Sequence, residues 1–213
     1  MAPSEPVLRR LLVDIGRRLA NQGLIVAAEG NLSVRLGGHA FLVTPAGVPK
    51  GARRPQDLLV VDRAGRCAAG QPTSEWPLHR ALYAARPDAR AVCHAHPPWA
   101  TAFSVAGRDL DGSVLTETEG TLPRVPLAPR AAPGTEQLPA SVVPWIREHD
   151  AVLLGSHGVV TVGPDPESAF GRLETVERLA QVTLLAEIAA GRSGLDSAVL
   201  RDLIARATQS PAP

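Results

Sequence analysis

The chain has 213 residues, of which 45% are hydrophobic and 20% charged, and its formal net charge is +1. This composition suits one globular domain with a full core, and it leaves no basic field for nucleic acid. The sequence contains no apolar signal core, no stretch near the roughly 18 apolar residues of a membrane span, and too few cysteines for a disulfide framework. We therefore expect a cytoplasmic protein that binds neither nucleic acid nor membrane.

The first half of the chain alternates between helical and extended patterns. Apolar residues at helical spacing predict a first helix over 6–23, which stops at Gly23. Five further elements are expected in this order: a β-hairpin over 31–47, a strand, turn and shorter strand over 57–70, a helix over 74–87 with Ser74 as its N-cap, a strand over 89–96, and a short helix over 97–107.

The second half predicts fewer strands and the longest helix. Residues 112–120 and 124–129 are typical of short extended pieces, while Pro139 and Pro144 limit the helix expected within 135–150. Four elements follow: two strands around GSHG in 151–163, a helix over 165–191, and a last helix over 195–207. Helices that flank and interrupt short strands predict one α/β domain with three layers, α/β/α.

Three histidines stand where apolar strands end. His94 and His96 are two residues apart on one expected strand, so they project from the same face. His157 lies in the glycine-flanked turn GSHG. Together they suit a catalytic zinc site with three nitrogen ligands and one open position, but histidines that only cap the sheet remain an alternative. The other histidines, His39, His79 and His149, are expected at the surface.

The segment PTSEWPLHR begins the helix expected over 74–87. The hydroxyls of Thr73 and Ser74 and the free N–H groups of the helix start form a natural anion pocket. Glu75 is interpreted either as a first-turn carboxylate favoured by the helix dipole or as a general base near the metal. The arginine doublets, which include Arg53-Arg54, predict solvated faces or loops.

Six segments resemble, in order, the signatures of the class II aldolase/adducin family: EGNLSVR, VTPAGVP, PTSEWPLH, AVCHAHPP, VPLAPRAAPGT and LLGSHGVV. The resemblance covers roughly residues 8–190. It implies a single family domain over 1–213, with its core in roughly 8–190 and a C-terminal helix and tail over 191–213. It also implies a mixed, mostly antiparallel central sheet and a homotetramer with active sites between subunits.

The resemblance also implies roles for particular residues. It implies Zn²⁺, or another divalent metal such as Mn²⁺, Co²⁺ or Fe²⁺, held by His94, His96 and His157. Glu75 matches the catalytic glutamate. Four residues fall on positions that bind the substrate phosphate: Asn31, Gly47, Thr73 and Ser74.

Departures from the family pattern affect the phosphate pocket and the second acid/base. Ala28 and Ala46 replace threonines that help to bind phosphate in the fuculose-phosphate enzyme. The tail has no tyrosine acid like that of the same enzyme. Glu117 lies roughly where the family's dehydratase carries a glutamate, and this resemblance makes it the candidate for the second acid/base, ahead of Glu119. The alternative for Glu117 is a solvent-facing strand residue.

The resemblance implies a metal-dependent aldolase that cleaves a small sugar phosphate or hydroxy-ketone through a metal-stabilised enediolate. A dehydratase or epimerase of the same family shares that step and is the closest alternative. A non-catalytic, adducin-like scaffold is the alternative of another class. The only lysine, Lys50, stands in a Pro/Gly loop, which agrees with a route that needs no Schiff base.

Overall fold

The computed structural model describes residues 3–37 and 39–191. Contacts group the chain up to Ala180 into one compact unit and the chain from Gln181 onward into a second. Every candidate site residue belongs to the first unit. The helix expected over 195–207 lies outside the described residues, and a single domain over 1–213 stays a prediction. Among the described residues, no helix combines the length and the apolar composition needed to cross a bilayer.

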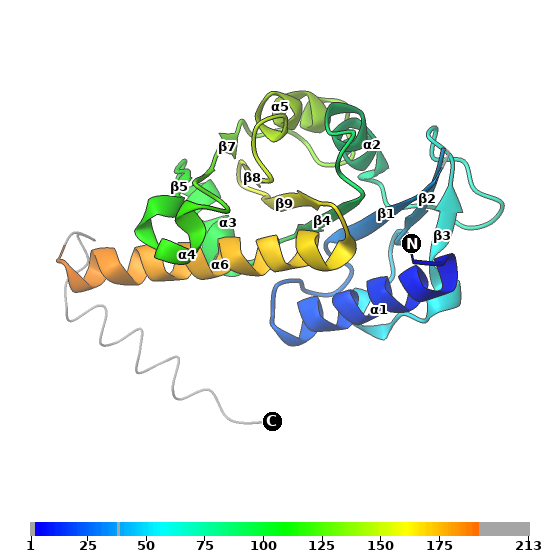
Figure 1. The fold of residues 1–213 in the computed structure, drawn as a ribbon, viewed down its shortest axis with the longest axis horizontal. Helices are drawn as coiled ribbons and strands as arrows, with labels where there is room; N and C mark the ends of the chain where they lie inside the picture. Colours follow the sequence, from blue (N-terminus) through cyan, green and yellow to red (C-terminus); the bar gives the residue numbers. More distant parts are fainter. Residues whose placement is uncertain (1–2, 38, 192–213) are drawn as a thin grey trace. The chain divides into compact units, whose positions relative to one another are not determined.

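A seven-stranded mixed sheet forms the centre of the first unit (Figure 1). All neighbouring strands are antiparallel except β7 and β8, which are parallel. The strand order is β3 (Leu59–Val61), β2 (Ala40–Val43), β1 (Asn31–Gly37), β4 (Ala91–Ala95), β9 (Gly158–Gly163), β8 (Ala151–Leu154) and β7 (Leu127–Ala128). The short strands β5 (Leu110–Asp111) and β6 (Arg124–Val125) pair separately. The predicted mixed, mostly antiparallel sheet is confirmed.

Helices cover both faces of this sheet, as Figure 1 shows for α2 and α5 on one side and α1 on the other. The α-helices are α1 (Glu5–Asn21), α2 (Trp76–Ala85), α3 (Pro98–Val105), α4 (Thr116–Glu119), α5 (Gln137–Ile146) and α6 (Pro166–Ala189). Three 3₁₀ turns, η1 (Lys50–Ala52), η2 (Pro55–Asp57) and η3 (Gly112–Val114), lie in the connections. The predicted three-layer α/β/α arrangement is therefore present, with the sheet as its middle layer.

The central strands carry continuous apolar runs because both of their faces are covered. Every residue of β4, β8 and β9 is buried. On one face, Val92 and Val160 of the sheet pack in one cluster with Leu82 of α2 and Val142 of α5. Polar residues placed among these strands are therefore shielded from water, which is the setting of the candidate site.

Two expectations for local structure are wrong in an informative way. The 112–120 segment, expected to be extended, forms η3 and α4, because Thr118 Oγ1 donates hydrogen bonds to the carbonyls of Gly112 and Leu115. Helix α5 is unbroken although it contains Pro139 and Pro144. Pro139 stands in the first turn, where an N–H has no helical partner.

The helix expected from Ser74 begins at Trp76, and Glu75 occupies the N-cap position. The second strand expected within 57–70 is absent among the described residues. Only an isolated bridge joins Pro45 to Pro72 in that region. Glu75 therefore precedes the helix instead of lying inside it, and the segment before Glu75 reaches the sheet region through the bridge between Pro45 and Pro72.

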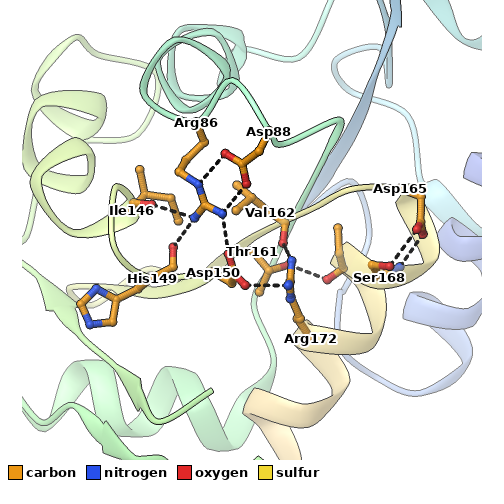
Figure 2. A network of polar contacts seen from close by, with 11 residues as sticks. Arg86, Asp88, Ile146, His149, Asp150, Thr161, Val162, Asp165, Ser168 and Arg172 are labelled. Carbon is orange, nitrogen blue, oxygen red and sulfur yellow. Dashed lines mark hydrogen bonds and ion pairs between the residues drawn. The ribbon is translucent and has the colours of Figure 1, made fainter. Parts of the chain in front are cut away.

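A charged cluster, here called the arginine network, consists of Arg86, Asp88, Asp150 and Arg172 (Figure 2). Arg86 pairs with Asp88 at 2.7 Å and with Asp150 at 2.8 Å, and it donates to the Ile146 and His149 carbonyls at 3.1 Å. Arg172 of α6 pairs with Asp150 at 2.6 Å. The network joins the end of α2, the segment before β8 and the first turns of α6.

Candidate active site

The sheet brings the three strand-end histidines together. β4 and β9 are neighbours, with His94 opposite Val160, so His96 just after β4 lies beside His157 just before β9. The ring centroids are 4.8 to 4.9 Å apart in all three pairs. One ring nitrogen from each histidine lies within 4.8 Å of the other two. The predicted convergence of these rings is confirmed.

Glycines make this approach possible. A Cβ atom on Gly158 would lie 2.5 Å from the Ala95 carbonyl oxygen and 2.7 Å from Cδ2 of the His96 ring. A Cβ atom on Gly30, whose φ is +66°, would lie 2.7 Å from the His94 carbonyl oxygen. The glycines of GSHG and EGN are therefore needed for close contact between neighbouring segments at the site.

The ring orientations fit a metal ion. His94 Nδ1 lies 2.8 Å from the Val159 carbonyl oxygen and must donate to it, so Nε2 is the ring nitrogen that faces the cluster. His96 Nε2 lies 3.1 Å from this atom, and His96 Nδ1 lies 3.3 Å from a Glu29 carboxylate oxygen. Nδ1 of His157 is buried with no hydrogen-bond partner among the described residues. Three facing imidazoles, two of them held by outer partners, suit a divalent cation.

Glu75 lies beside the histidines and is 6% exposed. Its Oε2 accepts a hydrogen bond from Asn31 Nδ2 at 2.9 Å and lies 3.0 Å from His94 Nε2, while Oε1 lies 3.4 Å from His157 Nε2. Burial alone would raise the pKa of Glu75. The charge of His94 and the hydrogen bonds from His94 and Asn31 outweigh burial and hold this pKa well below its usual range. Glu75 is therefore an ionised carboxylate within a shielded site.

The four residues expected to bind phosphate lie on three adjoining segments. Ala46 N donates to the Gln71 carbonyl at 3.0 Å, and Thr73 N donates to the Thr44 carbonyl at 3.1 Å, so the Gly47 turn lies beside Thr73 and Ser74. Leu32 N donates to Thr44 Oγ1 at 3.1 Å, which brings in the segment of Asn31. Gly47 and Ser74 are exposed, Thr73 and Asn31 are buried, and their role in binding stays a prediction.

Two buried cations support these segments, and sequence reasoning missed both. Arg53, expected to be solvated, is 1% exposed and donates to the carbonyls of Pro45 and Val48 on either side of the Gly47 turn. Lys50 is 3% exposed and donates to the Ala28 carbonyl. Burial and the charge of Arg53 lower the pKa of Lys50 to about 8, against the attraction of Glu75 and Glu29. A positive field therefore lies close to the glutamate.

His79 was expected at the surface and is fully buried instead. Its Nε2 lies 2.5 Å from Asn31 Oδ1, and its Nδ1 lies 2.6 Å from Ser33 Oγ. Burial and the charge of His94 lower the pKa of His79 to about 3, so the ring is neutral. The available signal was spacing, because His79 follows Glu75 by four residues and so shares its helix face. His39 is exposed and His149 half-buried.

Glu117 does not join this cluster within one chain. It lies on α4 rather than on a strand, and its side chain is exposed, as is that of Glu119. In the described part of the chain, the Glu117 carboxylate makes no hydrogen bond or ion pair. Its role as second acid/base stays a prediction that depends on a neighbouring subunit or on a bound substrate.

Residues 10–184 match the family model described as "Class II Aldolase and Adducin N-terminal domain". The chain is 33% identical over 178 residues to L-fuculose phosphate aldolase of Escherichia coli K12, covering 83% of this chain and 82% of that protein. It is 31% identical over 182 residues to the 5-methylthioribulose-1-phosphate/5-deoxyribulose-1-phosphate aldolase of Rhodospirillum rubrum, covering 85% and 82%. The crystal structure of L-fuculose-1-phosphate aldolase from Thermus thermophilus superposes with a TM-score of 0.78 at 37% identity, covering 89% of this chain and 98% of that one.

Proposed function

Because this chain belongs to the class II aldolase and adducin family, we propose that it is a metal-dependent aldolase-type lyase acting on a small sugar phosphate or hydroxy-ketone. The observation that carries the proposal is the buried Glu75 carboxylate within 3.4 Å of a group of three facing histidines. A scaffold protein has no need for three crowded imidazoles beside an ionised glutamate, since such a cluster costs stability.

His94, His96 and His157 would hold the metal through their ring nitrogens. When bound, a divalent ion supplies Lewis acidity to the carbonyl and hydroxyl oxygens of a ketose. His94 stays oriented by its hydrogen bond to the Val159 carbonyl. The Glu29 carboxylate, 3.3 Å from Nδ1 of His96, does the same for the second ring.

Glu75 would move the proton at the reacting carbon. Its Oε2 is held by Asn31, whereas Oε1 accepts no hydrogen bond among the described residues. Oε1 is thus the atom available to accept the proton of the hydroxyl group that becomes the aldehyde and to deliver it to the carbon that the broken carbon–carbon bond leaves behind. Its burial excludes bulk water from this exchange.

The substrate anion would bind where the Asn31, Gly47 and Thr73–Ser74 segments adjoin. Thr73 and Ser74 supply hydroxyl groups to this region, and the buried Arg53 fixes the carbonyls on both sides of the Gly47 turn. Ala28 and Ala46 offer no hydroxyl there. We therefore propose a phosphate or another small anion as the bound group, in a cytoplasmic homotetramer with Glu117 as the second acid/base.

A dehydratase is the second candidate. Methylthioribulose-1-phosphate dehydratase of Methylococcus capsulatus is 32% identical over 184 residues, about as similar to this chain as the aldolases are. Both reactions pass through an enediolate beside the carbonyl, which forms by carbon–carbon cleavage in an aldolase and by proton removal in a dehydratase, and Glu75 would transfer the proton at that carbon in each. The products differ, because an aldolase releases an aldehyde and a dehydratase releases water without breaking a carbon–carbon bond.

The test combines metal analysis with a substrate panel. The purified protein is expected to carry about one divalent ion per chain, and ketose 1-phosphates and free hydroxy-ketones are assayed for aldehyde release and for dehydration. Glu75→Gln is expected to lower turnover by about 10²–10⁴-fold. A metal-free wild type that cannot be loaded would favour the scaffold. Equal turnover by wild type and Glu75→Gln would remove Glu75 from the reaction.

A further inference from the structure

A line of buried polar groups runs from helix α2 through strand β1 to Glu75. Tyr83 OH lies 2.8 Å from Ser33 Oγ, which lies 2.6 Å from His79 Nδ1. His79 Nε2 lies 2.5 Å from Asn31 Oδ1, and Asn31 Nδ2 lies 2.9 Å from Glu75 Oε2. We propose that His79 is a positioning residue for Glu75, acting through the amide of Asn31. The proposal rests on the proposed role of Glu75.

The direction of each hydrogen bond follows from the orientation of the Asn31 amide. Asn31 Nδ2 donates to Glu75 Oε2 at 2.9 Å, so the NH₂ group of the amide faces the carboxylate. The Asn31 carbonyl oxygen then faces His79, which has to donate to it from Nε2. His79 is thereby fixed as the tautomer that carries its proton on Nε2.

The outer half of the line agrees with this tautomer. A neutral ring with its proton on Nε2 leaves Nδ1 as an acceptor, so the Ser33 hydroxyl donates to it. The Ser33 oxygen can then accept the hydroxyl proton of Tyr83. Every group in the line thus has a donor facing an acceptor, from Tyr83 to Glu75.

Because the line is buried, the orientation of the Asn31 amide depends on its hydrogen bond from His79. Asn31, Ser33, His79 and Tyr83 are each at most 5% exposed, so water does not replace a lost partner. Without the His79 N–H, the Asn31 amide can flip and turn its oxygen toward the Glu75 carboxylate, where the two acceptors repel. His79 therefore holds Asn31 in the orientation that fixes Oε2 and leaves Oε1 open. The second N–H of the Asn31 amide stays available to a substrate oxygen.

The tautomer is measured by ¹⁵N NMR of the histidine rings in the metal-loaded protein at pH 7, with His79→Gln identifying the His79 signals. We expect a neutral ring with the proton on Nε2. An imidazolium, or a ring with its proton on Nδ1, overturns the proposal. Because this readout needs no substrate, it decides the inference even where the proposed activity is absent.

Kinetics of three variants then test the effect on Glu75. His79→Leu keeps a side chain of moderate volume but cannot donate, and it is expected to lower kcat by about 10–100-fold, with KM within about threefold and the metal content unchanged. His79→Gln keeps an amide N–H and is expected to recover most of the lost kcat. His39→Gln, in the exposed hairpin turn, is the matched control and is expected to behave as wild type.

The pattern across the variants separates positioning from packing. Equal losses in His79→Leu and His79→Gln contradict the proposal, because a merely structural ring is not rescued by an N–H donor. If His79→Leu does not fold, Tyr83→Phe removes only the outermost hydroxyl and is expected to lower kcat by a few-fold. An unchanged kcat in Tyr83→Phe, together with a His79 ring protonated on Nδ1, refutes the proposal.

Discussion

Two polar clusters in the same unit differ in how completely their polar groups are paired. In the arginine network, carboxylate and guanidinium groups alternate at 2.6–2.8 Å, and the remaining donors reach backbone carbonyls. In the candidate active site, three imidazoles face one another, with His94 Nε2 only 3.1 Å from His96 Nε2. Glu75 Oε1 and His157 Nδ1 are buried without a hydrogen bond among the described residues.

The contrast separates structural from functional polarity. A network with every member paired contributes rigidity, whereas a crowded and half-satisfied one costs stability and is retained where a ligand or reaction completes it. A divalent cation would supply what the three histidines lack. We therefore expect variants of the candidate active site to change metal binding and turnover, with little effect on stability. Variants of the arginine network should change stability, with little effect on turnover.

Removing a histidine ligand has the largest expected effect. His94→Ala deletes the most buried of the three rings, so metal content should fall from about one ion per chain to near zero. Turnover should fall more than about 100-fold, since loss of an outer-shell partner alone costs about 10–100-fold. The measurements are mass-spectrometric metal analysis and the aldehyde-release assay.

The exposed His39 provides the control for this variant, and His39→Ala should retain metal and turnover. A His94→Ala protein that keeps its metal would show that the crowding of the rings has a different cause. Metal binding would then no longer explain why the polar groups of the candidate active site are left unpaired.

Breaking the arginine network should affect stability instead. Asp150→Ala removes the carboxylate that Arg86 and Arg172 share, and these side chains are 16% and 28% exposed. The loss lies between that of a buried and a surface ion pair, at about 2–3 kcal/mol of the free energy of unfolding. Denaturant unfolding measures it, and turnover per folded molecule should stay unchanged.

Asp109→Ala is the matched control, because its partner Arg124 is 54% exposed and the pair is solvated. It should cost no more than about 0.5 kcal/mol. If Asp150→Ala lowers the free energy of unfolding no more than this control does, the arginine network does not stabilise the fold. The contrast with the active site then disappears.

Much of this contrast could be predicted from the sequence, because strand periodicity is local. Two residues on one strand face the same way, so His94 and His96 had to project together, and GSHG placed His157 at the edge of another strand. What the sequence does not encode locally is which strands become neighbours. The pairing of β4 with β9 and with β1 converts three separate patterns into one site.

The errors have a common physical origin, since tertiary contacts override local polarity. His79 and Arg53 look like surface residues, yet each finds buried partners on segments distant in sequence: Asn31 and Ser33 for His79, and the turn carbonyls for Arg53. Pro139 and Pro144 look like helix breakers, but α5 is held by buried Val142 and Ile146. Glu117, expected on an extended segment, lies on helix α4, and no contact within the described residues explains its role.

The neutral His79 predicts a pH dependence of folding. Its pKa falls from 6.5 to about 3 on folding, through burial and the charge of His94. Between these values the unfolded chain binds the extra proton, so stability decreases as pH falls below about 6.5. The slope is at most about 1.4 kcal/mol per pH unit, or about 2 kcal/mol down to pH 5.

Denaturant midpoints of wild type and His79→Gln between pH 5 and 7, at equal metal content, isolate this contribution. The Gln variant should show a flatter profile, and the slopes of the two profiles should converge toward pH 7. Parallel profiles would mean that folding does not lower the pKa of His79, which contradicts its neutral, buried state.

Asp88 should give the smallest effect and so mark the solvated edge of the arginine network. Hydrogen bonds from Arg86 hold the pKa of Asp88 below its ordinary value of 3.8, so its contribution is present above about pH 4 and is lost as pH falls through the folded value. Because the Asp88 side chain is 65% exposed, solvent screening limits the contribution to less than about 1 kcal/mol. Asp88→Asn should therefore lower the free energy of unfolding slightly at pH 7, less at high salt, and progressively less as pH falls below about 4. A loss as large as that of Asp150→Ala would place Asp88 at the centre of the network, and exposure would no longer rank its members.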